Sequence, residues 1–341
     1  MRTPLKERFE KKVIPIPWTG SVGHMMGITE RIDAITAIPP TYLREDPPAP
    51  RSVKIELTGR CNFRCAFCAL RTRAVQPKGD MDFALFQRIT TQMREAGVEE
   101  IGLFYLGESF SAPALLASAN AWCKRGLGFP YVFLTTNGSL ARPEVVADCM
   151  EAGLDSLKFS INAADDEQFE AVMGVKARLF ARALENLKAA RAIRDNGGFK
   201  CGLYASSIRY DGEQHAKMEA LIERDVRPYV DEHYWLPLYS MGAQANEREA
   251  ELGYRPTAGN QGRLEALREP LPCWSAFTEG HVTADGFLSA CCFDADSRWT
   301  MGDLNRDGFM TAWHSEPFRE LRRAHLARDV TGSVCENCVA Y

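Results

Sequence analysis

Three cysteines crowd one short segment of the chain, RCNFRCAFC (60–68). Cys61, Cys65 and Cys68 leave one thiol over in any pairing into disulfides, and they fall one short of the four ligands that a structural zinc site uses. Three thiolates from one loop can instead hold three corners of a cubane iron–sulfur cluster and leave the fourth iron without a protein ligand. Phe67 would then pack beside the cluster and help to exclude water. A partial zinc site or a chance grouping of thiols is the alternative.

A second group of cysteines lies near the C-terminus. Two separated cysteines and the closing CENC provide four thiolates, which saturate either a tetrahedral zinc ion or a cubane cluster. Spacing alone leaves both metals open. The expected ligands are Cys273, Cys291, Cys335 and Cys338, and Cys292 is able to take the place of Cys291.

The composition excludes several classes of protein. The 341 residues carry a net charge of −4 and the basic residues are scattered, so no nucleic-acid partner is indicated. No run of about 18 uncharged apolar residues occurs, and the N-terminus lacks the apolar segment of a signal peptide. We therefore expect a cytoplasmic protein with no membrane partner. In that compartment the eleven cysteines are expected to include metal ligands rather than a disulfide framework.

The elements that position the first cysteine group alternate regularly from residue 53 onward. Segments of helical period, such as 81–97 and 178–198, separate short runs that are typical of buried parallel strands. Such repeats predict right-handed crossovers and a parallel sheet, either open or curled into a partial barrel, with functional sites at the C-terminal ends of the strands. RCNFRCAFC follows the first strand directly. The predicted strands are 53–58, 100–106, 131–136, 156–162, 200–207 and 230–238.

Changes in composition divide the chain into four parts. Residues 1–50 form an N-terminal extension whose proline-rich end favours an extended strap, and residues 51–240 hold the strand–helix repeats. The polar, glycine-rich residues 241–272 are typical of a linker. Residues 273–341 form a small cysteine-containing domain, in which Asp285-Gly286 predicts a two-residue hairpin turn.

The pattern C-x3-C-x-aromatic-C at the end of the first strand resembles the signature of radical S-adenosylmethionine (radical SAM) enzymes. Further matches follow in order at successive strand ends. LGESF (106–110) resembles the family's Gly-Gly-Glu-Pro motif, TTNGS (135–139) its Thr-Asn-Gly turn, and FSIN (159–162) its Ser-Ile-Asp segment. Leu106 and Ser109 depart from the first of these motifs, which keeps its central glycine and glutamate.

The resemblance implies a partial (β/α)6 TIM-like barrel followed by a small α+β domain of the SPASM/twitch type. It also implies S-adenosylmethionine and two [4Fe–4S] clusters as cofactors: a SAM-binding cluster on the first three cysteines, and an auxiliary cluster on the four C-terminal ones. An electron donor such as flavodoxin or ferredoxin is the implied protein partner. The residues expected to contact the SAM cofactor and its cluster are Phe67, Gly107, Glu108, Asn137, Ser160 and Asn162, the last in place of the more common aspartate.

The reaction implied by the resemblance is reductive cleavage of SAM to a 5′-deoxyadenosyl radical, which abstracts a hydrogen atom from the substrate. The layout most resembles the alcohol dehydrogenase of aminocyclitol antibiotic biosynthesis. We therefore expect oxidation of a small-molecule alcohol, aminocyclitol or sugar-like, with the auxiliary cluster as electron acceptor. One alternative is epimerisation of a sugar or cyclitol, with Cys201 or Cys292 as hydrogen-atom donor. The others are modification of a peptide or protein, and a zinc-stabilised binding protein without catalysis.

Overall fold

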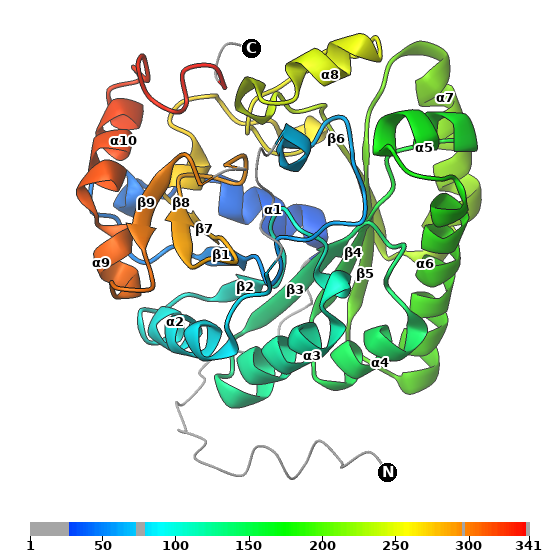
Figure 1. Cartoon of the computed structure of the whole chain (residues 1–341), viewed down its shortest axis with the longest axis horizontal. Helices are drawn as coiled ribbons and strands as arrows, with labels where there is room; N and C mark the ends of the chain where they lie inside the picture. Colours follow the sequence, from blue (N-terminus) through cyan, green and yellow to red (C-terminus); the bar gives the residue numbers. More distant parts are fainter. Residues whose placement is uncertain (1–26, 73–78, 295–296, 339–341) are drawn as a thin grey trace.

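The computed structural model describes residues 27–72, 79–294 and 297–338. Within these residues the strands form one curved sheet in the order β6-β5-β4-β3-β2-β1-β7-β8-β9 (Figure 1). β1 to β6 are parallel to their neighbours, as the alternating pattern predicted. The six parallel strands are β1 (Ser52–Ile55), β2 (Glu100–Gly102), β3 (Tyr131–Thr136), β4 (Ser156–Ser160), β5 (Gly202–Ile208) and β6 (Glu232–Leu236).

The two faces of the parallel strands have different roles. In β4, Leu157 and Phe159 are fully buried in the hydrophobic core. Lys158 and Ser160 alternate with them and line cavities on the inner side of the sheet. This period of two follows from the pleat of a strand, in which successive side chains point to opposite faces. The inner face of the sheet is therefore available for binding.

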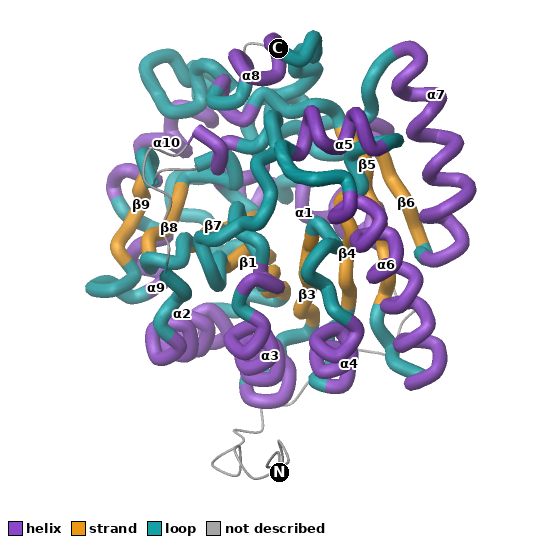
Figure 2. Tube along the Cα trace, turned by 45° about the vertical axis from the view of Figure 1, so that its right-hand side comes forward, coloured by secondary structure: helices purple, strands orange, loops and turns teal. Residues whose placement is uncertain are grey.

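Helices cover the outer face of the parallel strands, as Figures 1 and 2 show. The Asp82 carboxylate caps α2 (Phe83–Glu95) by accepting a hydrogen bond from the Leu85 N–H at 2.8 Å, and α6 (Arg178–Gly197) is followed by Gly198, whose φ of 62° is left-handed. No helix in the described part of the chain combines the length and apolar character needed to cross a membrane. The helices that cover the outer face are α2 (Phe83–Glu95), α3 (Pro113–Ala121), α4 (Pro143–Glu151), α5 (Asp166–Met173), α6 (Arg178–Gly197) and α7 (Gly212–Leu221).

The C-terminal part continues the same sheet. β7 (Glu279–Val282) pairs in parallel with β1, and β8 (Phe287–Ser289) and β9 (Thr300–Asp303) follow antiparallel. The expected hairpin is present, but the two-residue turn is wrong in length, because residues 283–286 connect β7 to β8 and Gly286 adopts a φ of 83°. The proposed domain boundary at residue 273 stays a prediction, since one sheet runs across it.

The segments on either side of the barrel differ from simple connectors. α1 (Ile28–Thr36) lies on the inner side of the sheet (Figure 1). Its side chains line a cavity there. Residues 1–26 of the expected extension lie outside the described residues. The stretch predicted as a linker, 241–272, contains the short helix α8 (Asn246–Glu251). Both segments therefore contribute structure around the inner face.

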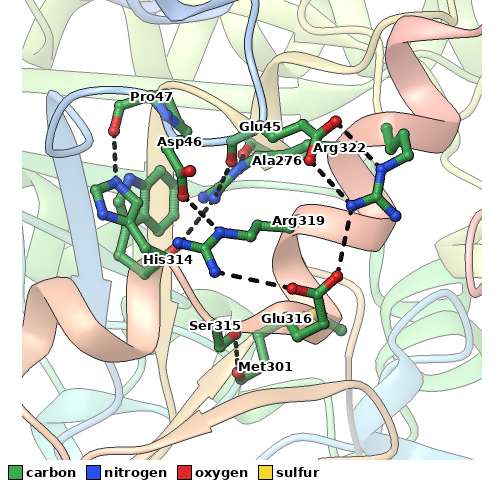
Figure 3. A network of polar contacts seen from close by, with 12 residues as sticks. Glu45, Asp46, Pro47, Ala276, Met301, His314, Ser315, Glu316, Arg319 and Arg322 are labelled. Atoms are coloured by element: carbon green, nitrogen blue, oxygen red, sulfur yellow. Dashed lines mark hydrogen bonds and ion pairs between the residues drawn. The ribbon is translucent and has the colours of Figure 1, made fainter.

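A polar network ties the strap after α1 to the C-terminal helix α10 (Glu316–Leu326), as Figure 3 shows. Arg322 is fully buried at its centre. Its Nε donates to the Ala276 carbonyl at 2.8 Å, and its Nη1 donates to the carbonyls of Trp313 and Glu45 at 2.7 and 3.1 Å. The shorter helix α9 (Phe309–Trp313) precedes α10. Two further contacts join this part of the chain: Arg319 on α10 bonds Asp46 at the surface, and His314, just before α10, bonds the Pro47 carbonyl.

Candidate functional site

The loop that follows β1 carries the first cysteine group and folds against α5. The Cys65 carbonyl accepts a hydrogen bond from the Cys68 N–H at 3.2 Å, so these two cysteines belong to one turn. The Arg64 N–H donates to the Met173 carbonyl at 2.9 Å, and Cys65 Sγ lies 3.5 Å from Met173 Sδ. Cys61, Cys65 and Cys68 are all half-buried. The three thiols predicted as cluster ligands are thus held on one loop at the carboxyl end of the barrel.

The electrostatics of this loop disfavour an isolated thiolate. Burial, with a smaller contribution from the Glu108 carboxylate, raises the pKa of the Cys61 thiol to about 12. Thiolate is the form that binds metal, and it is stable in such surroundings only beside positive charge. Iron ions would supply that charge, so the donor chemistry of the loop fits an iron–sulfur cluster.

Two glutamates fasten the LGESF loop to its neighbours. The Glu56 carboxylate, 1% exposed, accepts hydrogen bonds from the backbone N–H groups of Gly107 and Ala284, each at 3.1 Å. The Glu108 carboxylate accepts from the Thr136 hydroxyl at 2.9 Å and from the Asn137 N–H at 2.8 Å. Burial raises the pKa of Glu108 in spite of these donors. Glu56 therefore joins the barrel to the C-terminal part. Glu108 joins the loops that follow β2 and β3; we call the loops at the carboxyl ends of the parallel strands the rim loops, and that end of the barrel the rim.

Asn137 links the third rim loop to the cysteine loop. Its side-chain amide donates to the Asn62 side-chain oxygen at 2.9 Å, and the Asn62 amide donates to the Ser139 hydroxyl at 2.8 Å. The rim loops after β1, β2 and β3 are thereby held in one hydrogen-bonded unit. A unit of this kind fixes the geometry of whatever binds above it.

Gly107 stands where no side chain fits. A Cβ at this position would lie 1.9 Å from the Thr58 carbonyl oxygen, so Gly107→Ala has to push the LGESF loop away from the cysteine loop. We expect a loss of about 1–3 kcal/mol in the free energy of unfolding, typical of overpacking. A shift of about 1 Å at the site would lower the rate of 5′-deoxyadenosine formation by up to about 100-fold. Urea titration and a product assay measure these two effects.

Gly79→Ala is the matched control, because nothing lies within 4 Å of a Cβ built at Gly79. This variant should keep both the stability and the rate of the wild-type protein. Equal behaviour of the two variants would mean that the loop tolerates the displacement, and the packing argument for Gly107 would be wrong.

A cavity of about 240 Å³, which we call the chamber, opens above the rim. Asn162 is fixed at its wall, because its side-chain oxygen accepts from the Ile208 N–H at 3.0 Å. The chamber is enclosed by the cysteine loop, the ends of β4, β5 and β6, and the segment after β8. Sequence-predicted residues that line it are Phe67, Cys68, Ser160, Asn162 and Cys292.

Other predicted residues lie elsewhere. Gly107, Glu108 and Asn137 are behind the chamber wall, where their contacts join the rim loops to one another. Cys201 precedes β5 at its amino end, the opposite end of the barrel from the rim, and its Sγ lies 3.7 Å from the Gly202 carbonyl. The geometry does not bring Cys201 to the chamber, so of the two candidate hydrogen donors only Cys292 reaches it.

The C-terminal cysteines surround a separate cavity, which we call the auxiliary cavity. Cys273, Cys291, Cys335 and Cys338 all line it, together with apolar side chains such as Trp299. A cubane puts each cysteine on a different iron, so it needs cysteines around a hollow rather than sulfurs that converge on one point. Among the described residues, no three Cys, His, Asp or Glu side chains converge on a single ion position. The four-thiol, apolar lining fits a fully ligated cluster.

His325 on α10 connects two cysteines of the auxiliary cavity. Its Nδ1 accepts a hydrogen bond from the Cys273 N–H at 3.1 Å, so the ring proton is on Nε2, which lies 3.4 Å from Cys335 Sγ. Burial lowers the pKa of His325 to about 4. The ring is therefore neutral, with Nε2–H directed at the sulfur.

Replacing His325 with phenylalanine should lower the reduction potential of the auxiliary cluster. Hydrogen bonds to cysteine sulfur stabilise the more negative, reduced form of a cluster, and the substitution removes one while keeping a ring of similar size. A redox titration followed by electron paramagnetic resonance measures the potential. His314→Phe is the control, since His314 contacts the Pro47 carbonyl and no cysteine. An unchanged or raised potential in the His325 variant would contradict the hydrogen bond.

A third cavity, also of about 240 Å³, lies deeper between α1 and the sheet, and we call it the inner cavity. It meets the chamber at four shared residues, Leu236, Tyr239, Cys292 and Phe293. Sequence reasoning missed its charged lining. Lys54 and Lys158 interrupt the apolar strand runs VKIELT and SLKFSIN, and a charged residue inside a buried strand is the signal that indicates a lined interior.

Comparison with known families agrees with this geometry. A profile described as the radical SAM superfamily matches residues 55–223, and one described as an iron–sulfur cluster-binding domain (SPASM) matches residues 273–339. GTP 3′,8-cyclase of Synechococcus sp. (strain CC9902) is 26% identical over 278 residues, which are 71% of this chain and 79% of that protein. PqqA peptide cyclase of Streptomyces rochei is 33% identical over 149 residues, 44% of this chain and only 38% of that protein.

Solved structures share the fold at low sequence identity. BtrN in complex with AdoMet and 2-DOIA superposes with a TM-score of 0.55 at 14% identity, covering 85% of this chain and 92% of that one. Streptococcus suis SuiB bound to the precursor peptide SuiA gives a TM-score of 0.58 at 16% identity, covering 86% of this chain and 70% of that one. The expected partial barrel with a small C-terminal domain is confirmed. The iron–sulfur match replaces the zinc alternative for the C-terminal cysteines.

Proposed function

The chain belongs to the radical SAM superfamily, with S-adenosylmethionine and [4Fe–4S] clusters as cofactors and a SPASM-type domain at its C-terminus, and we propose that it oxidises a small-molecule alcohol. When bound, the SAM-binding cluster supplies the electron that cleaves SAM to a 5′-deoxyadenosyl radical for hydrogen abstraction, and the auxiliary cluster supplies an electron acceptor. The protein's own part is to hold these groups, to orient the substrate and to exclude water.

The residues proposed to hold the SAM-binding cluster are Cys61, Cys65 and Cys68. Ser160 and Asn162 line the chamber beside them and are suited to hydrogen-bond the hydroxyl groups of a nucleoside. Phe67 and Phe293 shield the same space from solvent with aromatic surface. Cys273, Cys291, Cys335 and Cys338 are proposed to hold the auxiliary cluster.

One observation carries the proposal of an oxidation. Cys291 lines the auxiliary cavity, and the next residue, Cys292, lines the chamber. The hydroxyl of Tyr105, another chamber residue, donates a hydrogen bond shared by the carbonyls of Cys291 and Asp294, at 2.7 and 2.9 Å. An electron acceptor in the auxiliary cavity would therefore stand one residue away from the substrate. Removal of two hydrogens from an alcohol needs such an acceptor nearby.

Epimerisation is the second candidate, and the position of Cys292 favours it. This thiol lines both the chamber and the inner cavity, where a donor could return a hydrogen atom to the opposite face of a sugar or cyclitol. Burial raises the pKa of Cys292 to about 12, so it carries the hydrogen that such a donor needs. Peptide modification is a third candidate, supported by the likeness to PqqA peptide cyclase and to SuiB.

The test feeds candidate alcohols, sugar-like or aminocyclitol, to the reduced enzyme with SAM in deuterated water. An oxidation should give substrate-dependent 5′-deoxyadenosine and a product that is two hydrogens lighter, without deuterium at the reacting carbon. An epimerase with a thiol donor should give an isomer of the substrate in which one hydrogen, at the reacting carbon, is replaced by deuterium from the solvent. A protein that stays colourless and zinc-loaded after anaerobic treatment with iron and sulfide would overturn the assignment to catalysis.

A further inference from the structure

Lys158 projects from β4 into the inner cavity, two residues below Ser160 on the same face of the strand. At about 3.3 Å per residue, this spacing puts the two side chains about 6.6 Å apart along the strand. Because the chamber and the inner cavity share four residues, a molecule of modest size reaches from Ser160 to Lys158 without leaving the enclosed space.

The other cations of the inner cavity already have partners. Lys54 Nζ lies 2.9 Å from the Glu279 carboxylate. Burial lowers the pKa of Lys54, but the Glu279 carboxylate, together with Cys292 and Glu100, leaves the pKa raised. Arg31 pairs with Glu100, and Arg263 Nη2 lies 2.6 Å from Asp33. Each of these charges is therefore neutralised by a carboxylate of the protein.

Lys158 has no such partner. Within the part of the chain that the structure describes, its amine forms no hydrogen bond or ion pair and lies 5.7 Å from the centre of the Tyr234 ring. Burial, with the nearby Lys54 ammonium, lowers its pKa to about 7. A buried cation without a counter-charge is costly, so an anion that enters the cavity would be attracted to this amine. The titratable and charged groups that line the cavity with it are Lys54, Glu279, Glu100, Arg31, Arg263, Tyr131, Tyr234, Tyr239 and Cys292.

We propose that the substrate carries an oxyanion, a carboxylate in the first instance, and that Lys158 binds it in the inner cavity. The proposal rests on the proposed function only in taking the inner cavity and the chamber as the place of the substrate. The reacting carbon would lie near Ser160 and the anion at Lys158. Aromatic side chains of Phe104, Phe133 and Trp274 form part of the remaining wall and fit an apolar body between the two ends.

The same charges disfavour a protonated amine. An ammonium group in the inner cavity would face Lys158 and Lys54, while Glu279 and Glu100 are already engaged. Like charges in a low-dielectric cavity repel strongly. A hydroxy acid thus fits this space better than the aminocyclitol that the family resemblance implied.

Competitive labelling of lysines with acetic anhydride tests the proposal on the anaerobic holoenzyme with SAM. The reagent acetylates only neutral amines, so labelling over a pH series reports the titration of each lysine. Lys176, 79% exposed, is the internal reference. In the free protein, Lys158 should titrate near pH 7. Sodium benzoate is the carboxylate probe, with benzamide as its uncharged isostere and benzylamine as the cation.

Benzoate should slow the labelling of Lys158 at least about fivefold at pH 7, because a bound carboxylate raises the pKa of a lysine by one unit or more and the neutral fraction falls accordingly. Benzamide and benzylamine should leave it unchanged. Inorganic phosphate in place of benzoate distinguishes a phosphate-bearing substrate from a carboxylic acid. If phosphate protects Lys158 more strongly than benzoate does, the anion site is supported and the substrate carries a phosphate group rather than a carboxylate.

Lys158→Met supplies a second measurement that does not depend on labelling. Benzoate should raise the melting temperature of the wild-type protein and of Lys158→Arg, but not that of Lys158→Met. The proposal is overturned if benzoate neither protects Lys158 nor raises the melting temperature, or if benzamide acts equally well. Neither readout needs turnover, so 5′-deoxyadenosine formation remains an independent test of the proposed function.

Discussion

Replacing Cys61, Cys65 and Cys68 together with alanine should reduce 5′-deoxyadenosine formation to the level seen without protein. The three thiols stand on one loop, and that loop is held to α5 and to the rim by backbone and side-chain hydrogen bonds that do not involve sulfur. The fold should therefore survive while the cluster is lost. Iron should fall from about eight to about four per chain, since the auxiliary cavity keeps its four cysteines.

A matched variant replaces Cys123, Cys149 and Cys201 with alanine. These three thiols are buried, and none of them lines the chamber or the auxiliary cavity. Both the iron content and the rate should stay close to wild type, apart from a modest loss of stability from the removed sulfur atoms. Iron analysis and a product assay on the two triple variants, side by side, test whether Cys61, Cys65 and Cys68 hold the SAM-binding cluster. Retention of eight irons by the first variant would mean that other ligands hold the SAM-binding cluster.

The barrel was predictable because its signals are local. Each parallel strand is a short apolar run followed by a segment of helical period, and parallel connections are almost always right-handed. α1 was not predictable in this way, since neither a capping side chain at Gly27 nor a terminal glycine marks its ends. The pairing of β7 with β1 was also hidden, because it joins distant parts of the chain and so brings the side chains of Lys54 and Glu279, 225 residues apart, into contact.

The cysteine sites were predictable as sets but not in detail. Spacing grouped the cysteines that the fold places on one loop and around one cavity, yet it left Cys291 and Cys292 interchangeable as candidate ligands. Folding separates them, because one lines the auxiliary cavity and its neighbour lines the chamber. Cys201 was proposed as a hydrogen donor because it lies in the apolar segment 200–207. The structure places it at the amino end of β5, away from the chamber, and the segment alone did not indicate which end of the strand this residue would occupy.

The inner cavity was the part of the site that local patterns could not reveal. Lys54 and Lys158 were visible as charges inside apolar strands, but whether each has a partner depends on β7 and α1. Glu279 reaches Lys54 from β7 and leaves Lys158 without a counter-charge in the described residues. Whether a charged side chain has a counter-charge can therefore be judged only from the whole fold.

Arg322→Met should lower the free energy of unfolding by about 2–4 kcal/mol. The guanidinium lies against the rings of both Trp313 and Phe318, at 4.2 and 4.1 Å from their centres, and methionine keeps that apolar contact. It cannot donate to the carbonyls of Ala276, Trp313 and Glu45, and each buried acceptor left without a donor costs about 1–3 kcal/mol. Burial also lowers the pKa of Arg322 to about 9. Relief of that unfavourable charge burial offsets part of the loss, which sets the expected range.

Arg319→Met, three residues earlier on the same helix, is the control for this change. Arg319 joins Asp46 at the surface, where an exposed ion pair contributes little, so its melting curve should stay near that of the wild type. α10 also carries His325 and Leu321 into the wall of the auxiliary cavity. The Arg322 variant should therefore release iron from that cavity to a chelator faster than the Arg319 variant does. Urea titration and chelator kinetics measure the two effects. Equal stability of both variants would mean that the burial of the guanidinium costs as much as its hydrogen bonds contribute.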